Sequence, residues 1–190
     1  ANMDGYERVI AFKTSPSVDV AVGQVESDRL RFTTEYPPEG WDVYLPQEKL
    51  AERLYYRRTI VLVKGGKQDF FVIRDQYCGP EVSATYCLHV LSDACRRDGP
   101  YFKFGNLTLF CAQPADTAVS RHDWTFEKKK RNKELIIREA TKGIRLTQSG
   151  VSGSFVTVLY PGSDAPSMES IENGVRVGGT EVVFAGGLDA

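Results

Sequence analysis

Two residues near the middle of the chain have side chains suited to proton transfer or metal binding. Asp75 ends the apolar segment 70–74, a position typical of a functional carboxylate or of a turn-forming aspartate. His89 lies near the end of the next apolar segment, 82–91, and an imidazole can transfer protons or bind a metal ion near neutral pH. Asp75 and His89 are therefore candidate functional side chains.

If residues 76–81 form a simple hairpin loop, Asp75 and His89 lie roughly 20 Å apart along neighbouring strands. Their contact therefore requires a bulge, a wider loop or strands that cross between two sheets.

A second group of candidate residues combines an aromatic side chain with positive charge. Trp124 offers an apolar face for stacking on a sugar, and His122 lies close to it in the sequence. A basic run follows that can contact an anionic polymer; it consists of Lys128, Lys129, Lys130 and Arg131. These six residues are candidate contacts for an acidic polysaccharide. The alternatives are an exposed loop histidine and a solvated hairpin tip.

Arg57 and Arg58 point to opposite faces if their segment is a strand, so one of them faces inward. An inward arginine is costly unless a carboxylate binds it, and Asp75 or Asp69 on the next strand can do so. A structural ion pair and a substrate contact are the two interpretations, and the ion pair is favoured.

Short apolar segments with period-two alternation are expected to position these residues. Turn residues separate the segments at intervals of roughly 8–15 residues, which is typical of sandwiches and barrels. The expected strands are 8–14, 18–22, 30–34, 42–45, 56–64, 70–74, 82–91, 101–111, 133–139, 143–148, 154–160, 174–177 and 181–185. The pattern predicts an all-β protein, a two-layer antiparallel β-sandwich of the jelly-roll or supersandwich type. Residues 1–190 are expected to form a single domain.

At most one short helix is expected, over residues 47–54, because Pro46 suits a first helical turn. The segment 82–91 allows its two faces to be assigned. The core face is predicted to carry Val82, Ala84, Tyr86, Leu88 and Val90. His89 then lies on the opposite, more polar face, where it can be reached.

Composition excludes several classes of protein. The 190 residues include 24 Lys+Arg and 25 Asp+Glu, so the net charge of −1 gives no general field for binding nucleic acid. No run reaches the roughly 18 apolar residues of a membrane helix, so no membrane partner is expected. The chain begins without methionine and without a signal-peptide pattern, which indicates a piece of a longer protein.

The four cysteines lack the C-x2-C spacing of thiolate metal sites. They are Cys78, Cys87, Cys95 and Cys111. Free, mostly buried thiols are favoured, and two disulfides remain an alternative.

Three consecutive segments resemble a known family. They read YRRTIVLVK (56–64), DFFVIRD (69–75) and TYCLHV (85–90), and a closing hairpin over 174–185 follows. This order resembles the β-rich C-terminal region of heparinase II/III-like polysaccharide lyases, where an Arg-led strand precedes a strand ending in Asp and a strand ending in His.

The resemblance implies a metal site made of two histidines and one aspartate. Asp75 and His89 match two of these ligands, and Tyr56 stands near the place of the third. Structural zinc is normally held by about four ligands, so an Asp75–His89 hydrogen bond without metal is the favoured form of the implied site. No cofactor is expected apart from a structural zinc ion in the event that this site is completed.

The resemblance also implies β-elimination on a uronic acid. That reaction neutralises the carboxylate, removes the C5 proton and protonates the O4 leaving group. In the family most of the required residues come from a separate helical toroid upstream, with His89 the one contribution expected from this region. A periplasmic or extracellular location follows from the same resemblance.

Two hypotheses result. In the first, the chain is the C-terminal sandwich domain of such a lyase, acts on acidic polysaccharide with its own upstream helical domain as partner, and is inert alone. In the second, it is a stand-alone carbohydrate-binding β-sandwich module.

Overall fold

Alternating β-branched and polar residues fold into thirteen strands, and the described residues contain no helix. The computed structural model describes residues 2–3, 6–31, 47–92, 94–114, 118–129 and 136–188. The strands are β1 (Asn2–Met3), β2 (Tyr6–Thr14), β3 (Val18–Arg31), β4 (Gln47–Val63), β5 (Phe70–Leu91), β6 (Arg96–Asp98), β7 (Tyr101–Phe104), β8 (Leu107–Gln113), β9 (Ala118–Lys129), β10 (Ile136–Pro161), β11 (Met168–Ile171), β12 (Gly174–Val177) and β13 (Thr180–Val183). None of these residues forms a helix that could span a membrane.

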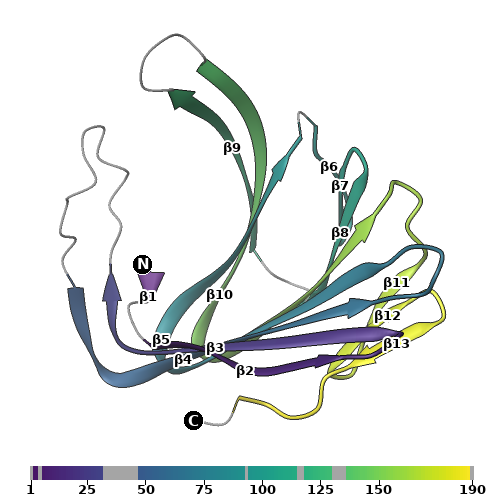
Figure 1. The fold of residues 1–190 in the computed structure, drawn as a ribbon. Helices are drawn as coiled ribbons and strands as arrows, with labels where there is room; N and C mark the ends of the chain where they lie inside the picture. Colours follow the sequence, from purple (N-terminus) through teal and green to yellow (C-terminus); the bar gives the residue numbers. More distant parts are fainter. Residues whose placement is uncertain are drawn as a thin grey trace.

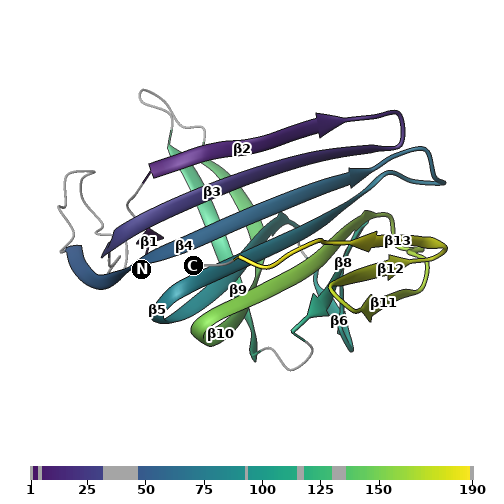
Figure 2. The same ribbon diagram turned by 90° about the horizontal axis from the view of Figure 1, so that it is seen from below.

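The strands form two antiparallel sheets. The large sheet has ten strands in the order β1-β3-β4-β5-β10-β8-β7-β6, with β2 paired to β3 and β9 paired to β10. The small sheet has the order β11-β12-β13. Figure 1 shows the large sheet strongly curved, and Figure 2 shows β11–β13 and the C-terminal segment lying across it. The predicted all-β, two-layer antiparallel sandwich is confirmed.

Irregular pairing in four neighbouring strands coincides with the bend of the large sheet. Asp28 of β3 stands opposite four residues of β4, 50–53. Val151 of β10 stands opposite three residues of β5, 79–81, which include Gly79 and Pro80. Bulges bend a strand and increase its twist, and they are one of the few places in a sheet that tolerate proline. Residues 79–81 therefore form a bulge that bends β5, and the strand continues through them instead of ending in a turn.

A hydrophobic cluster lies on each face of the large sheet. On the outer face the small sheet packs through Val175 and Val177 against the large sheet; this cluster also contains Val61, Phe70, Val72, Phe110, Val156 and Val158. On the inner face the sheet packs against itself; that cluster contains Tyr77, Tyr86, Phe102, Phe104, Leu109, Ile144, Leu146 and Phe155.

The helix predicted over residues 47–54 is wrong, because this segment is the first part of β4. Gln47, Glu48 and Lys49 pair with β3, and Leu54 is buried. Pairing with a neighbouring strand here outweighs the helix propensity of a short polar segment. The segments 70–74 and 82–91 also form one strand, β5, while the segment 101–111 is two strands joined at Gly105 and Asn106.

The predicted faces of segment 82–91 are confirmed. Tyr86 is 4% exposed, and Val82, Ala84, Leu88 and Val90 pack against the inner cluster. The alternate residues, which include Cys87 and His89, are exposed. Period-two alternation therefore assigns this half of β5 correctly.

Leu88→Ala is expected to lower the free energy of unfolding by about 1–2 kcal/mol. Leu88 is half-buried, so it loses less than the about 2–5 kcal/mol typical of a fully buried leucine. Urea denaturation of both proteins measures the difference. Leu146→Ala provides the comparison, since Leu146 is fully buried in the same cluster. An equal loss of stability in both variants would contradict the difference in burial between Leu88 and Leu146.

Candidate functional site

Asp75 binds Arg58 and not His89. Arg58 Nε donates to Asp75 Oδ1 at 2.7 Å, and Arg58 Nη2 donates to Oδ2 at 2.8 Å. The two residues are directly opposite each other on β4 and β5. Asp75 is only 2% exposed, and a bidentate arginine satisfies both oxygens of a buried carboxylate. The structural ion pair favoured from the sequence is confirmed.

Two tyrosines, the half-buried Tyr56 and the buried Tyr86, lie close to this ion pair. Burial, together with the negative charge of Asp75, raises the pKa of Tyr56 well above its ordinary value. Burial also raises the pKa of Tyr86 to about 12. Both phenols therefore stay protonated at neutral pH, so they can donate hydrogen bonds but do not supply a phenolate base.

The arginine of the pair is held firmly in its charged state. The hydrogen bonds to Asp75 raise the pKa of Arg58, and its guanidinium lies 6.0 Å from the centre of the Tyr56 ring. Both oxygens of the Asp75 carboxylate are engaged by these bonds. The cluster of Tyr56, Arg58, Asp75 and Tyr86 is thus suited to holding β4 against β5 and lacks a positioned base.

The hypothesis of an Asp75–His89 site is wrong. Both residues lie on β5, which pairs with β10 along its length, with Asp75 opposite Phe155 and His89 opposite Gly143. They are fourteen positions apart on one strand, roughly 46 Å along the chain at the usual rise. Asp75 faces the inner cluster, whereas His89 is exposed on the other face.

The residues present do not fit the zinc site implied by the family resemblance. Arg58 occupies the Asp75 carboxylate, and Tyr56 contributes no metal-binding nitrogen. No group of three His, Cys, Asp or Glu side chains suited to a metal ion occurs in the described part of the chain. No chemical step is therefore assigned to a metal here.

The structure brings the two histidines to the same level of the sheet. His89 on β5 and His122 on β9 are both opposite Gly143 of β10, one on each side. Residues 136–140 of β10 pair only with residues 125–129 of β9 in the described part of the chain. These two segments form an arm, visible at the top of Figure 1.

Strand β9, which continues into the arm, contains four of the predicted polysaccharide contacts, and two of them, Lys128 and Lys129, lie in the arm itself. His122, Trp124, Lys128 and Lys129 belong to β9, and only their main chain is described. Lys130 and Arg131 lie outside the described residues. The structure thus places the Trp124–Lys129 segment on β9, and the predicted binding role is untested.

None of the four cysteines, all of which lie in the described part of the chain, forms a disulfide. Cys78 is buried, Cys95 and Cys111 are half-buried, and Cys87 is exposed. Burial raises the pKa of Cys111 to about 12, so its thiol is unreactive at neutral pH. The prediction of free thiols holds, although Cys87 is not buried.

Sequence reasoning missed the position of Tyr86 beside the ion pair and of Arg74 on the outer face. The alternation in segment 82–91 predicts Tyr86 in the core, but with residues 76–81 as a loop it does not place Tyr86 beside Asp75 and Arg58. Arg74 could have been placed from the sequence, because it follows Phe70 and Val72 at period-two spacing and therefore lies on the same face, that of the outer cluster.

No protein-family model matches the sequence, and no curated protein matches it. Solved structures do match the fold. A heparinase III aligns with a TM-score of 0.63 and 14% identity over 93% of this chain and 27% of that chain. Heparan sulfate lyase HepC from Pedobacter heparinus aligns with a TM-score of 0.56 and 17% identity over 94% of this chain and 27% of that chain. The fold expected from the resemblance is confirmed, and the chain spans about a quarter of the length of these enzymes.

Proposed function

We propose that this chain is the C-terminal β-sandwich domain of a heparinase-like polysaccharide lyase and works beside a separate helical domain. The observation that supports the proposal is the extent of the alignment, which includes nearly all of this chain but only 27% of each enzyme. The substrate of the whole protein is then an acidic, uronate-containing polysaccharide. An extracellular or periplasmic location accompanies this proposal.

The isolated domain is expected to be catalytically inert. β-Elimination requires a group that takes the C5 proton. The described cluster around Asp75 contains two protonated phenols and a carboxylate whose two oxygens both accept hydrogen bonds from Arg58, so it does not present such a group. His89 is exposed, so we assign it a proton-transfer role only in combination with residues of the helical domain. Trp124, His122 and the basic segment Lys128–Arg131 are proposed to contact the polysaccharide.

Given heparin, heparan sulfate or alginate, the 190-residue chain should produce no ultraviolet absorbance from unsaturated uronate. A full-length protein that includes the helical domain should produce it. Inactive full-length protein, or a reading frame that encodes no extensive helical segment upstream of Ala1, would contradict the proposal. Steady product formation by the isolated chain would show that it contains a complete active site.

A further inference from the structure

A groove with a volume of about 800 Å³ lies on the outer face of the large sheet. Its floor comes from β2, β3, β4 and β5, and one wall comes from residues 180–185. The volume falls within the roughly 300–1,000 Å³ typical of sites for small ligands. Valines supply most of the apolar lining, and the charged lining residues are Arg57, Lys64, Arg74 and Glu181.

Two of these four charges are already neutralised. Lys64 Nζ lies 2.7 Å from Asp19 Oδ1, and Glu181 Oε1 lies 2.6 Å from Nη2 of Arg176. For Arg57 and Arg74, in contrast, the described residues provide no carboxylate within ion-pair distance. The groove therefore has two positive charges that the described residues leave uncompensated.

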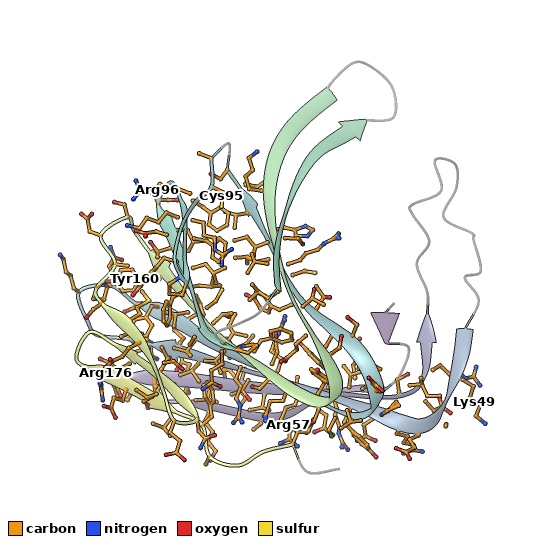
Figure 3. The ribbon with its side chains drawn as sticks, turned by 180° about the vertical axis from the view of Figure 1, so that it is seen from behind. Lys49, Arg57, Cys95, Arg96, Tyr160 and Arg176 are labelled. Atoms are coloured by element: carbon orange, nitrogen blue, oxygen red, sulfur yellow. The ribbon has the colours of Figure 1, made fainter. Side chains whose placement is uncertain are left out.

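Neutral groups hold both arginines in place. Nε and Nη2 of Arg57 donate to Oε1 of Gln24 at 3.2 and 3.0 Å. Nη1 of Arg74 donates to the carbonyl oxygen of Gly186 at 2.9 Å, and its guanidinium lies 5.4 Å from the centre of the Phe184 ring. Figure 3 shows Arg57 on the outer face beside the C-terminal segment. Both side chains are thus positioned without being neutralised.

The two arginines are close enough to bind one ligand together. Arg57 is opposite Gln76 and Thr59 is opposite Arg74, so the arginines are diagonal neighbours, about 7–8 Å apart between their backbones. Arg74 is only 9% exposed, and burial and the charge of Arg57 both lower its pKa. Two like charges, one of them buried, are unfavourable in a fold unless an anion offsets them.

We propose that Arg57 and Arg74 bind the carboxylate or sulfate group of an acidic saccharide in this groove. The planar guanidinium is well suited to such oxyanions. Thr59 and Gln76 border the arginines and can bond sugar hydroxyls, while Val61 and Val182 offer apolar contacts for the ring. The saccharide class rests on the proposed function, whereas the oxyanion follows from the groove itself.

The test measures binding of defined ligands to the 190-residue chain by isothermal titration calorimetry. The ligands are a disaccharide containing an unsulfated uronate, its sulfated form, a neutral disaccharide and inorganic sulfate at equal ionic strength. Either acidic disaccharide should bind and the neutral one should not. Arg57→Gln and Arg74→Gln should each weaken binding about 10- to 100-fold, the usual effect of losing a charge-assisted hydrogen bond.

Arg96→Gln is the matched control, because it removes the same charge from an exposed side chain whose closest described carboxylate, that of Asp98, is 3.9 Å away. This variant should bind as the original protein does. If Arg74→Gln does not fold, Arg57→Gln, at a half-buried position, still provides the comparison.

Unchanged affinity in both groove variants would overturn the proposal, and so would an equal loss in Arg96→Gln. Binding that is lost only in a Lys128→Gln/Lys129→Gln variant would place the saccharide on the arm, which overturns the groove site and leaves the proposed function intact. Binding of inorganic sulfate alone would overturn the saccharide as ligand. Because no outcome requires turnover, the result is independent of the lyase assay.

Discussion

Arg58→Met is expected to lower the free energy of unfolding by about 3–5 kcal/mol, because it leaves the buried carboxylate of Asp75 without its partner. Asp75 is 2% exposed and accepts both of its charged hydrogen bonds from Arg58. Removing Asp75 should cost less, since the side chain of Arg58 is 42% exposed and can turn toward water. Urea denaturation at neutral pH measures these differences.

Two further variants make this test specific. In Arg58→Met/Asp75→Asn the buried group is neutral, so part of the lost stability should return. Asp98→Asn breaks an exposed pair with Arg96 and should change stability by about 1 kcal/mol or less. If Arg58→Met also stays within about 1 kcal/mol of the original protein, the ion pair does not contribute as described.

The Arg58–Asp75 pair could be predicted because it depends only on local geometry. β4 and β5 are joined by a short turn, so their residues pair outward from Val63 and Phe70 in a fixed register. Alternation along each strand then gives the face. The same two rules assigned Tyr86 and Leu88 to the core.

The supposed contact between Asp75 and His89 failed because it depended on where β5 ends. Glycine and proline at positions 79 and 80 were interpreted as a turn, but they form a bulge in a continuous strand. Strand β10 decides between turn and bulge, because it pairs with both halves of β5 from fifty or more residues further along the chain. No local pattern contains that information.

Long-range pairing also explains the two other differences. Residues 47–54 are helix-like by composition, yet residues 47–49 and Leu54 pair with β3, which precedes them in the sequence by the segment 32–46. The groove containing Arg57 and Arg74 exists because residues 180–185 return to the outer face of the sheet. The faces of strands could thus be predicted from the sequence, whereas sites formed by distant segments could not.

Gly79→Ala tests directly whether the bend in β5 requires glycine, and it is expected to cost about 3 kcal/mol or more. Gly79 has φ of +144°, a conformation that other residues adopt only with strain of about 1–3 kcal/mol. A Cβ atom there would also lie 2.5 Å from the carbonyl oxygen of Arg53 and 3.0 Å from Cα of Leu54, so the backbone of β4 would have to move.

Gly99→Ala separates these two contributions. Gly99 also has a positive φ, +56°, but no atom lies within 4 Å of the position of its Cβ. This variant should therefore lose only about 1 kcal/mol, from backbone strain. Urea denaturation compares both variants with the original protein. Equal losses would mean that β4 does not restrict Gly79, whereas a clearly larger loss at Gly79 means that the close contact between the bulges of β4 and β5 determines the bend.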